Sequence, residues 1–140
     1  MTVADSSRPL TVLIVDDEPV NRLVLSRMIE LLGSQCLEAA SGDEALDLLG
    51  EQAVDLVLMD IQMPRMSGIQ TVEQLRVRPG PNREAPVVAV TGDTTRSKRD
   101  YLQLGFDDYT NKPISLAAVQ QMLQARRQVV SPGTPRNAVA

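Results

Sequence analysis

Five short apolar runs alternate with segments of helical period between residues 10 and 128. A short apolar run is typical of a buried strand, and its regular alternation with helices is typical of a parallel sheet covered on both faces. The predicted strands are residues 10–15, 35–39, 54–59, 86–90 and 106–111. We therefore predict one α/β domain over residues 10–128, built on a doubly wound, five-stranded parallel sheet with helices on both faces.

The segments between the runs carry clear helix signals. Pro19 suits a first helical turn, and Gly33 closes a stripe formed by Val20, Leu23, Val24, Met28, Leu31 and Leu32. Further helices are predicted at about residues 42–52, 69–76 and 95–104, and after Ser115. Five strand–helix units favour the flavodoxin-like strand order 2-1-3-4-5. Residues 1–9 and 129–140 lack periodicity and are predicted to be flexible tails.

Composition excludes several classes of function. The 140 residues include no histidine, one cysteine and three aromatic residues. Without histidine the chain cannot carry Ser-His-Asp or Cys-His catalysis or a histidine-based zinc site. Three aromatic residues and a net charge of −4 argue against a nucleic-acid interface, so we expect no direct DNA binding.

The compartment is also indicated by composition. Cys36 has no partner for an intramolecular disulfide, which favours a reducing compartment. No apolar run approaches the roughly 18 residues of a membrane span, and the first residues do not resemble a secretory signal. We expect a cytoplasmic domain without membrane insertion.

Polar side chains follow four of the predicted strands at the point where each strand ends. Asp16 and Asp17 follow the first run, Asp60 the third, Thr91 the fourth and Lys112 the fifth. In open α/β sheets, ligands bind outside the carboxyl ends of the strands, at the switch point of the strand order. We therefore expect these five side chains to meet at one edge of the sheet.

This set of side chains favours metal-assisted phosphoryl chemistry. Three crowded carboxylates repel one another unless a cation lies among them, and oxygen ligands alone favour Mg²⁺ or Mn²⁺. Lys112 and Thr91 can bind the oxygens of a phosphoryl group. A carboxylate can accept that group as an aspartyl phosphate, and Asp60, on the central strand, is the best placed to do so.

At these residues the sequence resembles the response-regulator receiver domain of two-component signalling, and its finer pattern is most like the receivers of hybrid histidine kinases. The resemblance covers about residues 10–127. It rests on four motifs: Val15-Asp16-Asp17-Glu18, Leu58-Met59-Asp60-Ile61-Gln62-Met63-Pro64 with Ser67-Gly68, Ala89-Val90-Thr91-Gly92, and Tyr109-Thr110-Asn111-Lys112-Pro113.

The resemblance implies a role for each residue. Asp60 would accept a phosphoryl group from a phosphohistidine on a histidine kinase or a histidine phosphotransfer protein. Mg²⁺ would be held by Asp16, Asp17, Asp60 and the main-chain carbonyl of Gln62. Thr91 and Lys112 would bind the phosphoryl group, and Tyr109 would rotate as Thr91 moves inward. The Lys112–Pro113 bond is expected to be cis.

The expected function is therefore a phosphoacceptor switch rather than an enzyme. Tyr109 and the basic residues Arg96, Lys98 and Arg99 suggest that the output surface comprises the fourth helix, the fifth strand and the last helix. A downstream protein or the chain's own kinase would detect this surface. Both a stand-alone regulator and a segment of a longer hybrid kinase fit the sequence.

Two alternative functions are weighed against the switch. A small Mg²⁺-dependent phosphohydrolase with an aspartyl nucleophile needs an acid–base Asp two residues after Asp60, where this chain has Gln62. A flavin mononucleotide module needs a Ser/Thr/Gly phosphate loop after the first strand, where this chain has Asp16-Asp17-Glu18. Both alternatives are less consistent with the residues present.

Overall fold

The computed structural model of the chain describes residues 9–129, which form a parallel five-stranded sheet surrounded by helices. The strands are β1 Thr11–Val15, β2 Gln35–Ala39, β3 Leu56–Asp60, β4 Val87–Thr91 and β5 Asp108–Asn111. Their order is β2-β1-β3-β4-β5, and every neighbouring pair is parallel. The predicted fold class and strand order are confirmed.

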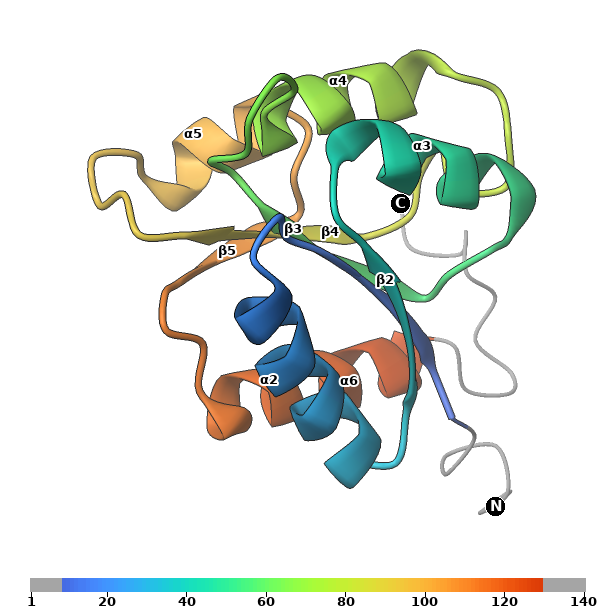
Figure 1. Ribbon diagram of the computed structural model, residues 1–140, viewed down its shortest axis with the longest axis vertical. Coiled ribbons are helices and arrows are strands. Elements are labelled where there is room, and N and C mark those ends of the chain that lie inside the picture. The colour runs from blue at the N-terminus through green and yellow to red at the C-terminus, as the bar shows by residue number, and fades with distance from the viewer. Residues whose placement is uncertain (1–8, 130–140) are drawn as a thin grey trace.

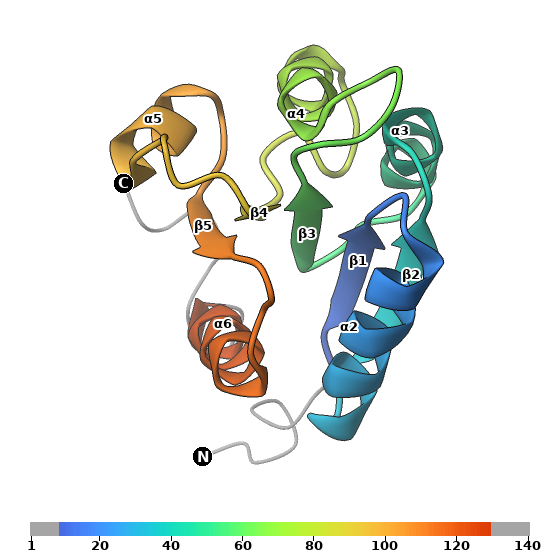
Figure 2. The same ribbon diagram turned by 60° about the vertical axis from the view of Figure 1, so that its left-hand side comes forward.

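Helices cover both faces of the sheet (Figures 1 and 2). One face carries α2 Pro19–Leu31 and α6 Leu116–Val129, and the other carries α3 Gly42–Glu51, α4 Gly68–Val77 and α5 Lys98–Gln103. No helix in residues 9–129 is long and apolar enough to cross a membrane. The tails predicted at 1–9 and 129–140 lie outside the described residues, apart from Pro9 and Val129, and their flexibility stays a prediction.

Alternate strand residues pack into two separate apolar layers. In β1, Leu13 and Val15 contact the layer beneath α3, α4 and α5, whereas Val12 and Ile14 contact the layer beneath α2 and α6. The central strands β3 and β4 are buried along their whole length. Because each buried aliphatic side chain contributes about 1.5–3 kcal/mol, this packing fixes the register and hence the positions of the strand ends.

Serine side chains determine where three helices begin. Ser41, Ser67 and Ser97 each accept a hydrogen bond from the backbone N–H three residues later. Ser97 and Asp100 form a reciprocal capping box, so α5 begins at Lys98, later than the predicted residue 95. The residues before it are held in a separate turn, in which the Asp93 carboxylate accepts a hydrogen bond from the Thr95 N–H at 2.8 Å.

The apolar stripe that predicts α2 coincides only in part with the buried face of that helix, since Met28 and Leu32 pack against the core and the rest of the stripe is exposed. Leu25, Ser26 and Ile29 face the core. Val20, Leu23 and Val24 are 68%, 52% and 47% exposed, and together form what we call the apolar patch of α2. Helical period identifies residues that share a face, but it does not identify what covers that face.

Asn82 joins three chain segments at the amino ends of β3 and β4. Its side chain is 1% exposed. The side-chain oxygen accepts a hydrogen bond from the Val54 N–H at 2.9 Å. The side-chain nitrogen donates to the carbonyls of Leu49 at 2.7 Å and Gln52 at 2.6 Å. This one residue therefore satisfies three backbone groups between α3 and β3.

We predict that Asn82→Ala lowers the free energy of unfolding by about 2–4 kcal/mol, because it leaves buried backbone groups without partners. Urea denaturation followed by circular dichroism measures this loss. Gln103→Ala, at an exposed position on α5, is the control and is expected to stay within about 0.5 kcal/mol of the wild type. Equal stability of the two variants would contradict the role assigned to Asn82.

Candidate functional site

The strand register brings the predicted residues to one edge of the sheet. Val15 pairs with Met59, so Asp16 and Asp60, each one residue further along, lie next to each other. Asp60 pairs with Val90, and Thr91 pairs with Asn111, which directly precedes Lys112. The parallel arrangement therefore places the ends of β1, β3, β4 and β5 around the same site.

Three carboxylates gather at this edge. Oxygen atoms of Asp16, Asp17 and Asp60 all lie within 4.8 Å of one another. Asp16 is 2% and Asp60 3% exposed, whereas Asp17 is half-buried. Three hard oxygen donors at this spacing fit a divalent cation of the Mg²⁺ type, and the site contains no nitrogen or sulfur ligand that would favour zinc.

Lys112 reaches into the carboxylate cluster from the end of β5. Its Nζ lies 2.9 Å from Oδ1 of Asp60 and 3.7 Å from Oδ2 of Asp16. Burial alone would lower the pKa of Lys112, but the hydrogen bond and charge of Asp60 and the charge of Asp16 raise it overall. Lys112 is therefore a cation at physiological pH, and it faces the carboxylate that is the predicted phosphoacceptor.

Asp60 is held in a polar but poorly solvated position. Burial raises the pKa of its carboxyl, the hydrogen bond from Lys112 opposes the rise, and the charge of Asp16 reinforces it. The net direction is upward, so burial and the neighbouring carboxylate outweigh the single ammonium. A second cation would relieve this imbalance.

Gly68 allows the loop after Asp60 to fold tightly against the end of β3. Its N–H donates to the Ile61 carbonyl at 2.9 Å. A side chain at Gly68 would collide with the backbone carbonyl of Asp60, so no larger residue fits without displacing the end of β3. In the same loop Arg65 adopts a left-handed conformation, with φ of 68°.

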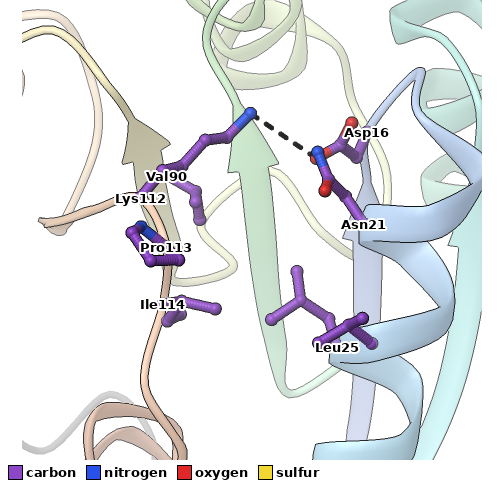
Figure 3. A pocket seen from close by; sticks show the side chains of 8 residues that line it. Asp16, Asn21, Leu25, Val90, Lys112, Pro113 and Ile114 are labelled. Atoms are coloured by element: carbon purple, nitrogen blue, oxygen red, sulfur yellow. Dashed lines mark ion pairs between the residues drawn. The ribbon is translucent and has the colours of Figure 1, made fainter.

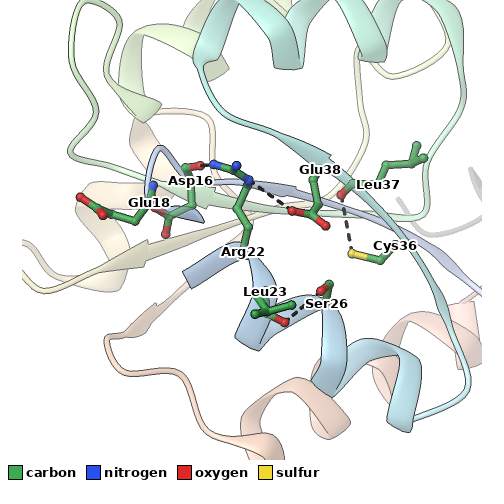
Figure 4. A network of polar contacts seen from close by, with 8 residues as sticks. All are labelled: Asp16, Glu18, Arg22, Leu23, Ser26, Cys36, Leu37 and Glu38. Atoms are coloured by element: carbon green, nitrogen blue, oxygen red, sulfur yellow. Dashed lines mark hydrogen bonds and ion pairs between the residues drawn. The ribbon is translucent and has the colours of Figure 1, made fainter. Parts of the chain in front are cut away.

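Arg22 fixes the position of the first acidic residue. Its Nη1 donates to the Asp16 carbonyl at 2.8 Å, and its Nε donates to Oε1 of Glu38 at 3.2 Å (Figure 4). The Asp16 carboxylate in turn accepts a hydrogen bond from the Glu18 N–H at 2.9 Å. The contacts join β1, α2 and β2 directly behind the site.

Cys36 lies near this network, with its thiol in the protonated form. Its Sγ lies 3.7 Å from the Leu37 carbonyl oxygen (Figure 4). Burial, with the negative charges of Glu38 and Glu30, raises the pKa of the thiol to about 12. At neutral pH the thiol therefore stays protonated and is a poor nucleophile.

Thr91 is buried at the end of β4, with an exposed fraction of 1%. Its hydroxyl oxygen accepts a hydrogen bond from the Asp93 N–H at 2.9 Å, and its carbonyl accepts one from the Lys112 N–H at 2.8 Å. Thr91 is thus bonded both to the loop that leads to α5 and to the end of β5. Tyr109 lies on β5, half-buried and packed against the layer of α3, α4 and α5.

A cleft of about 450 Å³ opens between α2 and the segment after β5, beside Asp16 and Lys112 (Figure 3). Its walls include Asn21, Val24 and Pro113, to which the sequence assigned no role. The Lys112–Pro113 peptide bond is cis, as expected. Pro113 ends the fourth motif of the resemblance, which is the sequence signal that points to it, whereas Asn21 lies three residues after the first motif.

Residues 12–124 match the response regulator receiver domain family. The chain belongs to this family. A receiver domain serves as a phosphoacceptor in two-component signalling, and the phosphohydrolase alternative is not favoured.

The receiver domain is similar to segments of much longer sensor kinases. Over 121 residues it is 37% identical to the sensor histidine kinase RcsC of Salmonella typhi and 39% identical to the sensor protein GacS of Pseudomonas syringae pv. syringae. These segments cover 86% and 84% of this chain but 12% and 13% of the two relatives. The chain therefore spans about an eighth of the length of these relatives.

Solved receiver structures share the fold. The receiver domain of sensor histidine kinase PA1611 from Pseudomonas aeruginosa PAO1, with a magnesium ion coordinated in its active-site cleft, matches with a TM-score of 0.77 and 30% identity. The match covers 86% of this chain and 98% of that one. A second match, in the co-crystal structure of the Saccharomyces cerevisiae histidine phosphotransfer protein Ypd1 with the receiver domain of Ssk1, has a TM-score of 0.77 and 26% identity. It covers 88% of this chain and 92% of that one.

The receiver domain thus brings Asp16, Asp17, Asp60 and Lys112 into one cluster, as the sequence predicts. Thr91 lies on the neighbouring strand end, bonded to the backbone of Lys112. The Gln62 carbonyl as a metal ligand and the individual roles of these residues stay predictions.

The raised pKa of Asp60 leads to a stability prediction for the metal-free receiver domain. A carboxyl whose pKa is higher in the folded than in the unfolded state opposes folding at neutral pH, and this cost disappears as the pH falls below the unfolded value. Asp60→Asn should therefore unfold at higher urea concentration than the wild type at pH 7 in EDTA. The difference should shrink toward pH 3.8, the ordinary pKa of aspartate.

Asp47→Asn, at an exposed position on α3, provides the matched control and should show no such pH-dependent gain. If Asp60→Asn were no more stable than the wild type at pH 7, or more stable by the same amount at every pH, the electrostatic interpretation of the site would be wrong.

Proposed function

We propose that Asp60 accepts a phosphoryl group from a phosphohistidine on a partner protein. The observation that carries the proposal is the 2.9 Å contact between the Lys112 ammonium and the Asp60 carboxylate, within a cluster that also contains Asp16 and Asp17. This arrangement joins a buried nucleophile, a fixed cation and a group of hard oxygen ligands at one strand edge.

Mg²⁺ or Mn²⁺ would be held by Asp16, Asp17 and Asp60, together with the main-chain carbonyl of Gln62. The clustered carboxylate oxygens support this assignment. A bound divalent cation would neutralise the cluster and the charge on the oxygens of the incoming phosphoryl group. Arg22 holds Asp16 through its backbone and so positions the first ligand.

In the transfer, a carboxylate oxygen of Asp60 forms a bond to phosphorus as the bond between phosphorus and the imidazole nitrogen of the donor breaks. The imidazole nitrogen keeps the electron pair of the broken bond. Lys112 can shift from the Asp60 carboxylate to a phosphoryl oxygen with little movement, since its Nζ already lies 2.9 Å from the carboxylate that attacks phosphorus. Thr91 would donate its hydroxyl to another phosphoryl oxygen.

Phosphorylation would then change the surface formed by α5, β5 and α6. The Thr91 hydroxyl accepts a hydrogen bond from the Asp93 N–H, and turning toward the phosphoryl group would break it. The loop that leads to α5 would be released, and Tyr109 would rotate into the space left by Thr91. A downstream protein or the chain's own kinase would detect the altered surface.

The chain itself would act as a phosphoacceptor without turnover of its own. Gln62 occupies the position where an aspartyl phosphohydrolase needs an acid–base residue, and an amide does not titrate at physiological pH. We also propose a cytoplasmic location without direct DNA contact, supported by the single cysteine, which has no intramolecular disulfide partner, and by the net charge of −4.

The donor would dock on the apolar patch of α2. Val24 lines the cleft, and Val20 and Leu23 lie beside it on the same exposed helix face. Ile114 lines the opposite wall of the cleft (Figure 3). A protein that presents its phosphohistidine to Asp60 must cover this rim, and the apolar side chains there provide contact area. The Ypd1–Ssk1 complex is an example of a receiver domain that binds a histidine phosphotransfer protein.

We predict that acetyl phosphate and a divalent cation add one phosphoryl group to the wild-type chain, and that Asp60→Asn abolishes the addition. Intact-protein mass spectrometry measures it. Asp47→Asn should be labelled like the wild type, because Asp47 is exposed on α3 and lies outside the site. EDTA should also suppress labelling. Full labelling of Asp60→Asn would refute the assignment of the acceptor.

A separate prediction concerns donor docking. Leu23→Ser combined with Val24→Ser should slow transfer from a phosphorylated histidine phosphotransfer protein by about 5- to 30-fold, the effect of losing about 1–2 kcal/mol of binding. Labelling by acetyl phosphate should be unaffected, since that donor needs no docking surface. Val77→Ser, at a 72% exposed position on α4, is the control. The docking site would be misplaced if both donors slowed equally or if Val77→Ser had the same effect.

A further inference from the structure

All three aromatic side chains of the chain gather in one cluster beside β5. The sequence contains two tyrosines, one phenylalanine and no tryptophan. The Tyr101 ring stacks on the Tyr109 ring, with centroids 5.2 Å apart and planes 22° apart. Phe106 meets Tyr101 edge-on, with centroids 5.8 Å apart and planes at 86°. In this chain, the aromatic residue proposed to rotate on phosphorylation is therefore packed against another aromatic ring.

Tyr101 is the fixed member of the stack. It lies on α5 and is fully buried, whereas Tyr109 on β5 is half-buried. The Tyr101 carbonyl also accepts a hydrogen bond from the Phe106 N–H at 3.1 Å. Gly105, with φ of 102°, makes the turn that returns the chain for this contact. Backbone and rings together hold Tyr101 in place beneath Tyr109.

The ring of Tyr101, and not its hydroxyl, makes these contacts. The hydroxyl is buried and has no hydrogen-bond partner within residues 9–129. An unpaired buried hydroxyl opposes folding, so hydrogen bonding does not explain why a tyrosine stands at position 101. Tyr101→Phe therefore keeps the stack, and Tyr101→Leu removes it while keeping an apolar side chain.

We propose that Tyr101 is a positioning residue of the switch, whose ring stabilises Tyr109 in the orientation seen here and so opposes phosphoryl-dependent rotation. The proposal rests on the proposed function, because it assumes that Tyr109 rotates once Asp60 carries a phosphoryl group. On this proposal the stack breaks as Tyr109 enters the space left by Thr91. The apparent affinity of any ligand that favours the rotated state is then lowered, because few molecules occupy that state before the ligand binds.

The expected effect follows from the strength of an aromatic pair. Such pairs contribute about 0.5–1.5 kcal/mol beyond area burial, which converts to a change of about 2- to 12-fold in an equilibrium constant. Without the stack, the rotated state becomes more populated before ligand binds, and a phosphoryl analogue should bind more tightly by up to this factor.

The test is a titration of the full chain with beryllofluoride, an analogue of the aspartyl phosphoryl group, in the presence of Mg²⁺. Calorimetry gives the half-saturating concentration for the wild type, Tyr101→Phe and Tyr101→Leu, after thermal unfolding has shown that each is folded. Tyr101→Leu should bind about 2- to 12-fold more tightly than the wild type, and Tyr101→Phe within about twofold of it. Because Tyr109 is the only tyrosine left in both variants, tyrosine fluorescence follows its change of environment directly.

Unchanged binding by Tyr101→Leu, or an equal shift in both variants, would overturn the proposal. If Tyr101→Leu does not fold, NMR of ¹³C-labelled tyrosine in the wild type decides, with Tyr101→Phe used for assignment. The Tyr101 ring signal should shift when beryllofluoride binds, and a signal that does not shift would overturn the inference. A wild type that binds no beryllofluoride, or an Asp60→Asn variant that binds it equally well, would instead overturn the proposed function on which the inference rests.

Discussion

The contact between Lys112 and Asp60 is the interaction on which the site depends. Three carboxylates lie within 4.8 Å of one another, and two of them are almost fully buried. Burial, reinforced by the charge of Asp16, raises the pKa of Asp60, and the Lys112 ammonium at 2.9 Å opposes only part of this rise. The fold therefore holds the three carboxylates together although the ammonium balances only part of their negative charge. A divalent cation would supply the positive charge that balances the carboxylates.

The fold makes this crowding possible by burying the strands on both faces. β3 and β4 lie in the middle of the sheet, and their apolar side chains anchor the two helical layers. The free energy of that packing holds the carboxylates together against their repulsion. Parallel register then places the end of every strand at the same edge, so residues separated by up to about 100 positions in the chain share one site.

Much of this arrangement could be predicted from the sequence. The strand order and the cluster of Asp16, Asp60 and Lys112 follow from apolar runs and from the polar residues that end them, because a parallel sheet converts sequence position directly into spatial position.

Contacts between side chains of different elements could not be predicted in this way. Period alone did not reveal that the apolar patch of α2 faces outward, that Arg22 binds the Asp16 carbonyl, or that Tyr101 stacks on Tyr109. The late start of α5 depended on the capping box at Ser97, a local hydrogen-bond pattern that competes with helix period.

The central claim is that the carboxylate of Asp60 becomes an acyl phosphate, and chemical trapping tests this most directly. The chain is incubated with acetyl phosphate and Mg²⁺ and then treated with borohydride, which reduces an acyl phosphate to an alcohol and so converts the modified aspartate into homoserine. Peptide mass spectrometry then identifies the converted residue. We predict homoserine at position 60 and at no other aspartate. Homoserine at Asp16 or Asp17, or none at all in a chain that carries a phosphoryl group, would contradict the assignment of Asp60 as the acceptor.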